Sequence, residues 1–359
     1  MKKKVLVSGV QSSGKLHIGN YFGAIRQNVE LGNSGDYESY VFIADYHSMT
    51  SLTDADARRE NTFDAACVYL ACGLDPEKVT FFKQSDVPEH TELSWILNTV
   101  TPMPMLMLAH SFKDKLYKNL VYESELEIES MFRDANSSKE SIIQHRSYKE
   151  FSTINSALLT YPVLMAADIL MYNADVVPVG KDQEQHLEIT RELAGKYNRA
   201  YGVEQFVMPK AHIVGEVATV PGVDGRKMSK SYDNHIPLFG TPEEIKKRVM
   251  GIVTDSAAPA DKKNPDENNI YQIHKLFLNV EQDKELRKKF EGGGYGYKQA
   301  KDELLETILK FTAPMREKYE HYRSNKEEVE QILHRGAEKA KKKARETMLQ
   351  VKQQTGLDS

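Results

Sequence analysis

The segment "KVLVSGVQSSGKLHIGN", residues 4–20, holds the pattern that decides the fold. Its first five residues form a short apolar run, as expected of a β-strand buried on both faces. Polar and glycine residues follow, and a helical pattern then begins near Gly19, with Phe22, Ile25 and Val29 on one face. A strand, a glycine-containing turn and a helix in this order predict a place where backbone amides can hold an anion.

The same alternation recurs along the first two thirds of the chain. Further apolar strands are predicted at residues 40–45, 79–82 and 174–179, and helices at 54–72 and 182–197. Strands that alternate with helices of this length indicate an α/β fold. We therefore predict a Rossmann-like, doubly wound parallel sheet with helices on both faces.

Strand patterns stop near residue 240, and helical patterns continue to the end. The first of these helices has Thr241 as a good N-cap, Pro242 at its first position and Glu244 at its third. We predict an α/β domain over residues 1–240 and an all-helical domain over 241–359.

The composition narrows the class of protein. The chain has 359 residues, 40% hydrophobic and 28% charged, with a net charge of −4, so any nucleic-acid contact must come from a local patch. Cys67 and Cys72 are expected to be core residues, because their spacing on a helix prevents them from sharing a metal.

Residues 117–152 are charged and weakly periodic, and we predict a surface insertion there. The apolar run after the basic start is too short for a signal peptide, no stretch is long enough to span a membrane, and a cytoplasmic location is expected.

One nucleotide motif is present only in part. Gly9, Gly14 and Lys15 match the G-x-x-x-x-G-K pattern of a P-loop. The next residue is Leu16, which lacks the hydroxyl that holds magnesium in that motif. Asp45 ends a predicted strand, but carboxylates at strand ends are common. A P-loop hydrolase is therefore a distant alternative.

Two other short motifs are more informative as a pair. "HIGN", residues 17–20, lies where the first loop becomes a helix, which favours anions. "KMSKS", residues 227–231, follows Gly222 and Gly225 and so lies on a loop that can move. Its two lysines, with hydroxyls beside them, can surround a pyrophosphate. Taken singly, each motif could be a solvated helix start or a basic surface loop.

Together the two motifs resemble those of the class I aminoacyl-tRNA synthetases. Longer stretches resemble the bacterial tryptophanyl-tRNA synthetases in particular: residues 8–27, 161–194, 227–231 and 290–308. The resemblance covers most of residues 4–116 and 153–350. It implies ligation of L-tryptophan to tRNA(Trp) through an adenylate, with release of pyrophosphate and AMP. ATP would be a substrate that brings Mg²⁺, with no separate metal site in the protein.

The resemblance also implies a set of functional residues. The catalytic residues would be His17, Asn20, Lys113, Lys227 and Lys230. ATP would contact Gln11, Ser12, Ser13, Gly19, Asn20, Gly180, Lys181, Asp182, Ala218, Lys227, Met228, Ser229, Lys230 and Ser231. The assignment of Lys113 is carried by "HSFKDK", although the segment before it is less polar than in the family.

Asp168 is the candidate for choosing the amino acid. It lies in the apolar run "YPVLMAADILMY", where a carboxylate is costly unless it has partners. The indole N–H is only a donor, so an acceptor suits it, but tyrosine also presents a donor. Met165, one helical turn earlier, would lie against the ring, Gln183 would hold the amine or carboxylate, and Val7 stands where the family usually has Phe. The alternatives are a helix-capping or ion-paired structural role for Asp168 and core packing for Tyr161, Met165 and Met171, and for Met171 we expect core packing.

The partners follow from the same resemblance. The helical domain would read the anticodon, and the enzyme would be a homodimer. Residues 335–345 contain six basic residues and one acidic residue, and form either a solvated helix or a phosphate contact. The remaining alternatives are a tyrosyl-tRNA synthetase and an inactive RNA-binding or regulatory relative. The two lysines of "KMSKS" argue against the inactive relative, because a protein that only binds RNA does not need lysines that hold pyrophosphate.

Overall fold

The computed structural model describes residues 3–10, 12, 14–109, 112–113, 155–180, 183–213 and 220–358. The predicted insertion at 117–152 lies outside these ranges. Several predicted nucleotide contacts lie outside them as well, namely Gln11, Ser13, Lys181, Asp182, Ala218 and the side chain of Ser231.

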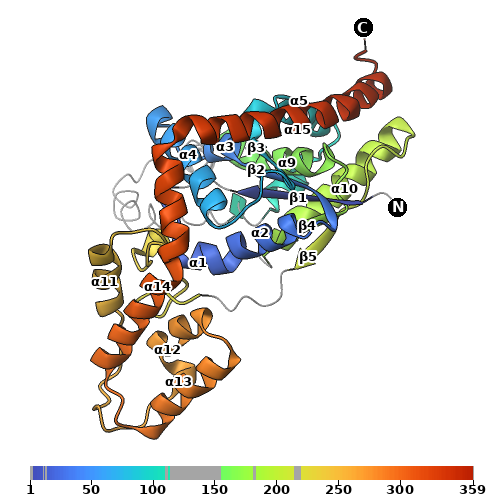
Figure 1. The fold of residues 1–359 in the computed structure, drawn as a ribbon. Helices are drawn as coiled ribbons and strands as arrows, with labels where there is room; N and C mark the ends of the chain where they lie inside the picture. Colours follow the sequence, from blue (N-terminus) through green and yellow to red (C-terminus); the bar gives the residue numbers. More distant parts are fainter. Residues whose placement is uncertain are drawn as a thin grey trace, which may run out of the picture.

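A parallel sheet forms the centre of the molecule (Figure 1). Within the described ranges its strands are β1 (Lys4–Val10), β2 (Tyr37–Ile43), β3 (Val79–Lys83), β4 (Val176–Val179) and β5 (Lys210–Ile213), in the order β3-β2-β1-β4-β5. Every neighbouring pair is parallel. This confirms the predicted Rossmann-like class. The sequence pattern did not reveal β5, because it has four residues and Lys210 and His212 interrupt its apolar character.

Helices cover both faces of the sheet. Along the first two thirds of the chain they are α1 (Ile18–Asn20), the π-helical turn η1 (Tyr21–Ile25), α2 (Arg26–Asn33), α3 (Asp45–Ser48), α4 (Ala55–Ala71), the short 3-10 turn η2 (Gln84–Asp86), α5 (Glu89–Asn98), α6 (Met103–Met107), α9 (Ser156–Leu170) and α10 (Glu184–Tyr201). Alternate residues of β2 enter two different cores. Val41 and Ile43 join the core that contains α4, whereas Tyr40 and Phe42 join the core that contains α9. The strand is therefore buried on both faces, as its apolar run predicts.

The C-terminal third is helical. Its elements are η4 (Lys230–Tyr232), α11 (Pro242–Met250), η5 (Pro265–Glu267), α12 (Asn269–His274), η6 (Lys275–Phe277), α13 (Val280–Gly292), α14 (Tyr297–Ser324) and α15 (Lys326–Thr355). The predicted start of α11 is confirmed in detail. The Glu244 amide donates to Thr241 Oγ1 at 3.2 Å, and the Thr241 amide donates to Glu244 Oε2 at 2.9 Å.

The last helix returns to the sheet. α14 runs away from the bundle of α12 and α13, and α15 then crosses beside β3 and α5 (Figure 1). A stripe of small buried residues, Gly336, Ala337, Ala340 and Ala344, makes this close approach possible. A Cβ atom at Gly336 would lie 1.8 Å from the Phe81 carbonyl oxygen. The sheet and the helical third thus share a contact far from residue 240, and the domain boundary there stays a prediction.

Two general expectations concern metals and membranes. The part of the chain that the structure describes contains no helix long and apolar enough to cross a membrane. Over the same residues, no group of three or more His, Cys, Asp or Glu side chains could hold a metal ion. Cys67 is buried and free, and burial raises the pKa of its thiol to about 12, so it behaves as a core residue.

Candidate active site

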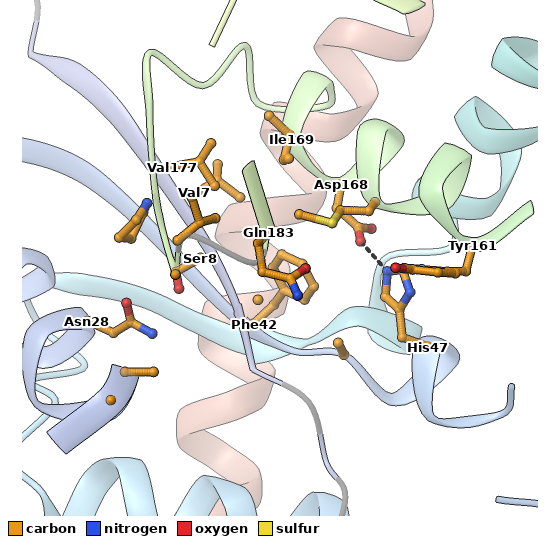
Figure 2. Close-up of a pocket in the computed structure, with 18 of the residues that line it drawn as sticks. Val7, Ser8, Asn28, Phe42, His47, Tyr161, Asp168, Ile169, Val177 and Gln183 are labelled. Carbon is orange, nitrogen blue, oxygen red and sulfur yellow. Dashed lines mark hydrogen bonds and ion pairs between the residues drawn. The ribbon is translucent and has the colours of Figure 1, made fainter. Parts of the chain in front are cut away.

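A cavity of about 450 Å³ opens at the carboxyl ends of β1 and β4. The strand order reverses between these two neighbours, and in open α/β sheets such a switch point is where ligands bind. The cavity is lined from several elements: Val7, Ser8 and Gly9 of β1, Phe42 of β2, His47 of α3, Tyr161, Met165 and Asp168 of α9, and Val177 and Val179 of β4 (Figure 2). Most of these side chains are apolar, so a buried acceptor among them would dominate the recognition of a ligand.

Asp168 is that acceptor, and its carboxylate is held from three sides. The residue is 1% exposed. Its Oδ1 accepts from Gln84 Nε2 at 2.7 Å and lies 2.6 Å from His90 Nδ1, while Oδ2 lies 2.8 Å from His47 Nε2 (Figure 2). His90 continues the chain, with its Nε2 2.8 Å from the Tyr172 hydroxyl. The side chain is therefore fixed in one orientation at the wall of the cavity.

The charge of Asp168 follows from the same contacts. Burial acts to raise the pKa of this carboxyl group, but hydrogen bonds from His47 and His90 outweigh it and hold the pKa below its usual value. The carboxylate thus stays ionised at neutral pH. An ionised acceptor in an apolar cavity favours a ligand that brings an N–H or O–H group and disfavours one that brings only carbon.

The predicted tryptophan contacts surround this carboxylate. Met165 and Val7 line the cavity, so Met165 is not plain core, and Gln183 lies between β1 and Asp168 (Figure 2). Tyr161 lines the cavity too, where its ring meets the ring of His47 edge-on at a centroid distance of 6.0 Å. Met171 is fully buried outside the lining, in the core.

The "HIGN" motif forms the start of α1. The Asn20 amide donates to His17 Nδ1 at 3.3 Å, and the His17 amide donates to Asn20 Oδ1 at 3.0 Å. Because Nδ1 accepts a hydrogen bond, the neutral ring carries its proton on Nε2. Burial, followed by the charges of Lys230 and His235, lowers the pKa of His17 to about 4. His17 is therefore a neutral donor at physiological pH.

The "KMSKS" loop lies directly against "HIGN". Met228 Sδ accepts a hydrogen bond from the Gly19 amide at 3.3 Å, across 209 residues of sequence. A Cβ atom at Gly19 would lie 3.0 Å from His17 Nδ1 and 3.2 Å from Met228 Cβ, both tight contacts, so glycine gives the two segments room to approach each other. Lys230 Nζ lies 3.6 Å from the place that a Cβ at Gly14 would occupy. The two predicted phosphate-binding segments thus meet beside the first loop.

Three further residues of the predicted nucleotide site, Ser12, Gly180 and Lys113, lie within the described ranges. Ser12 is 1% exposed, and its hydroxyl has no hydrogen-bond partner among the described residues. Gly180 lines the cavity. Lys113 is half-buried on a helical turn after α6, where its amide donates to the Ala109 carbonyl at 3.1 Å, and the cavity lining does not include it.

Sequence reasoning missed the partners of Asp168. His47 follows the second strand by four residues, and Gln84 and His90 follow the third. The carboxyl ends of parallel strands meet at one edge of a sheet, so polar residues just beyond those ends were the available signal. Asp45, by contrast, accepts hydrogen bonds from the Ser85 amide at 2.9 Å and from the Ser85 hydroxyl. Asp45 thus joins the ends of β2 and β3.

Comparison with known proteins agrees with this geometry. The family described as tRNA synthetases class I (W and Y) matches residues 2–313. The tryptophan–tRNA ligase of Fusobacterium nucleatum is 48% identical over 351 residues, 98% of this chain and 97% of that protein. The ligase of Rhodopirellula baltica is 41% identical over 352 residues, 98% of this chain and 99% of that one.

Solved structures give the same result in three dimensions. Campylobacter jejuni tryptophanyl-tRNA synthetase, complexed with ADP and tryptophan, superposes with a TM-score of 0.82 at 42% identity, covering 98% of this chain and 99% of that one. A tyrosyl-tRNA synthetase from Aeropyrum pernix, at 16% identity and a TM-score of 0.61, shares the fold. The chain, with "HIGN" and "KMSKS" meeting beside a cavity built around Asp168, belongs to the class I tRNA synthetases of the W and Y family.

Proposed function

We propose that this protein attaches L-tryptophan to tRNA(Trp) in two ATP-dependent steps. The observation that carries the proposal is the buried, ionised carboxylate of Asp168 in an apolar cavity beside the junction of "HIGN" and "KMSKS". The curated relatives described above are tryptophan–tRNA ligases, and this chain matches nearly the whole length of each. An amino-acid pocket and a phosphate site side by side are what amino-acid activation requires.

In the first step the tryptophan carboxylate attacks the α-phosphorus of ATP, and pyrophosphate leaves. The protein needs no nucleophile, because catalysis here consists of positioning and of stabilising charge on the phosphates. Gln183 would orient the amine or carboxylate of the substrate. His17 Nε2 would donate to a phosphate oxygen, and Lys227 and Lys230 would neutralise the leaving pyrophosphate.

In the second step a terminal ribose hydroxyl of the tRNA attacks the acyl carbon of the adenylate. The acyl–phosphate bond breaks, and AMP leaves with the electron pair of that bond. The same phosphate contacts that held ATP would hold AMP. Mg²⁺ would arrive with ATP and be carried by its phosphates. Asn20, Gly19, Gly180, Ser229 and the other predicted nucleotide contacts, with Lys113, complete the proposed site.

Selection of tryptophan rests on the carboxylate and on the space beside it. Phenylalanine would bury Asp168 without a donor, so we expect strong rejection. Tyrosine presents a donor at a different distance from the backbone, and the relatives favour tryptophan over it. Asp168 would accept from the indole N–H while Met165, Val7 and the other apolar residues enclose the ring.

The helical third and a second subunit are the proposed macromolecular partners. The helices from α11 onward would contact the tRNA anticodon. α5, α6 and the residue that follows α6 carry four large apolar side chains that are exposed, Trp95, Met103, Met107 and Leu108, which suits a subunit interface of a homodimer. A cytoplasmic location fits these partners.

ATP–pyrophosphate exchange with each of the twenty amino acids tests the proposed function. We expect exchange with tryptophan alone. Exchange with tyrosine alone would instead identify the sister enzyme, and no exchange with any amino acid would favour an inactive RNA-binding relative.

A further inference from the structure

The backbone of the "KMSKS" loop is organised by one buried amide side chain, that of Asn234, which is 1% exposed. Its Nδ2 donates to the Lys227 carbonyl oxygen at 3.1 Å, and its Oδ1 accepts from the Ser229 amide at 2.8 Å. These two bonds bracket Met228, the residue whose sulfur accepts from the Gly19 amide. Asn234 therefore holds the loop on both sides of its contact with "HIGN".

The preceding turn is built to receive this side chain. Asn234 Nδ2 also donates to Asp224 Oδ1 at 2.7 Å, and Asp224 in turn accepts from the Arg226 amide at 3.0 Å. A Cβ atom at Gly222 would lie 2.3 Å from Asn234 Cγ and Nδ2. The backbone of the turn closes on Asn234 as well, because the Val223 amide donates to its carbonyl oxygen at 2.8 Å. A glycine at 222 is thus required by the position of Asn234.

The residue before Asn234 is also constrained. Asp233 has a φ of 49°, a left-handed conformation that is uncommon for residues other than glycine. Arg248 of α11 donates to the Asp233 carbonyl oxygen at 2.6 Å and to its carboxylate at 2.5 Å. The end of the loop is therefore tied to the first helix of the C-terminal third.

We propose that Asn234 is a positioning residue for adenylate formation, acting through Lys227 and Lys230 without touching the substrates. The proposal rests on the proposed function. Charge on the leaving pyrophosphate develops during the reaction, so misplaced lysines lower kcat more than they weaken tryptophan binding. Among the described residues, the lining of the tryptophan cavity includes parts of β1, β2, β4, α3 and α9 but none of this loop, so the Michaelis constant for tryptophan is predicted to stay the same.

The decisive variant is N234D. The substitution is nearly isosteric, but it removes the N–H donors and places a carboxylate against Asp224 and against the Lys227 carbonyl. We expect at least a tenfold fall in kcat of ATP–pyrophosphate exchange, with the Michaelis constant for tryptophan within twofold of wild type. The double variant D224N/N234D removes the repulsion between the two carboxylates but restores no donor to the Lys227 carbonyl oxygen, so we expect its kcat to stay low.

N198D provides a matched control. Asn198, in the last turn of α10, donates from Nδ2 to the Phe206 carbonyl at 3.1 Å and accepts from the Gln205 and Phe206 amides at 3.1 Å each. It organises a loop with the same number of bonds, and it is not among the residues that line the cavity. We expect N198D to keep the wild-type kcat, which separates positioning from general loosening of a loop.

G222A is a second, independent variant, which leaves Asn234 chemically intact and displaces it sterically. It is expected to reproduce the fall in kcat at constant tryptophan Michaelis constant, so the test remains valid if N234D folds poorly. Wild-type kcat in N234D and G222A would overturn the proposal, as would wild-type kcat in D224N/N234D. A wild-type enzyme without exchange would refute the proposed function itself, before any variant is compared.

Discussion

At the scale of single residues, Asp168 is the centre of the account. Its presence in an apolar run predicted a costly carboxylate with partners, and the structure supplies them as His47, Gln84 and His90. The sequence could identify the acceptor but not its partners, because these come from segments that are distant along the chain. Their side chains converge only when parallel strands align their carboxyl ends.

We predict that Asp168→Ala lowers kcat/KM for tryptophan by about 100-fold, or about 3 kcal/mol. The substitution removes the acceptor for the indole and leaves two buried donors, Gln84 and His90, and the partly buried His47 without that partner. Preference for tryptophan over phenylalanine should narrow, as measured by pyrophosphate exchange with each amino acid. Asp175→Ala is the control, because Asp175 accepts from the Val5 amide at 2.8 Å and does not line the cavity. Unchanged selectivity in Asp168→Ala would exclude this residue from the pocket.

His274 leads to a prediction about pH and stability. It is 4% exposed on α12, and burial lowers its pKa from 6.5 to about 4. Between pH 4 and pH 6.5 the folded protein therefore binds fewer protons than the unfolded chain. The contribution of neutral His274 to the free energy of unfolding is fully present above pH 6.5 and is lost as the pH falls toward 4. The free energy of unfolding should drop by about 2 kcal/mol from this residue between pH 7 and pH 5.

Urea unfolding at the two pH values checks this prediction. His274→Gln should reduce the difference by that amount, whereas the exposed His334→Gln should leave it unchanged. An equal pH dependence in wild type and His274→Gln would contradict the assignment.

At the scale of elements, the period of the apolar residues predicted the strands and helices that pack most regularly. The capping residues of α11 were predictable because Thr241 and Glu244 act locally. The strand β5 and the π-helical turn η1 were not predicted, since one is too short and the other depends on its surroundings. The packing of α15 on β3 was also beyond sequence reasoning, because its small residues show only that something approaches closely.

The contact between α15 and β3 can be tested at Gly336. A methyl group there would meet the Phe81 carbonyl oxygen at 1.8 Å, so the helix must move. We predict that Gly336→Ala lowers the free energy of unfolding by about 3 kcal/mol. Gly292→Ala is the control, since nothing lies within 4 Å of a Cβ at that position. Equal urea midpoints for the two variants would show that α15 does not pack closely on the sheet.

At the scale of the whole molecule, distant segments create the site. "HIGN" and "KMSKS" predicted a phosphate site only as a pair, and the structure brings them into contact through Gly19 and Met228. The proposed dimer and tRNA contacts would use surfaces that the sequence pattern of one chain does not identify. Residues 335–345 were predicted to be either a solvated helix or a phosphate contact. In the structure Arg345 Nε lies 3.4 Å from Glu89 Oε1, and the alanines between the basic residues are buried.

The proposed homodimer predicts an effect of Met107→Glu. A charge within the exposed apolar cluster on α5 and α6 would have to be desolvated in the interface. We expect the dimer dissociation constant, measured by sedimentation, to rise at least tenfold. Leu357→Glu, a similar change at an exposed site beyond α15, should leave it unchanged. A wild-type protein that sediments as a monomer at all concentrations would contradict the prediction.

The most direct measurement is a crystal structure with L-tryptophan and a non-hydrolysable ATP analogue bound together. We expect the indole nitrogen within hydrogen-bonding distance of the Asp168 carboxylate. We also expect the phosphates between His17 on one side and Lys227 and Lys230 on the other. A nucleotide bound away from both motifs, or an indole that does not reach Asp168, would contradict these expectations.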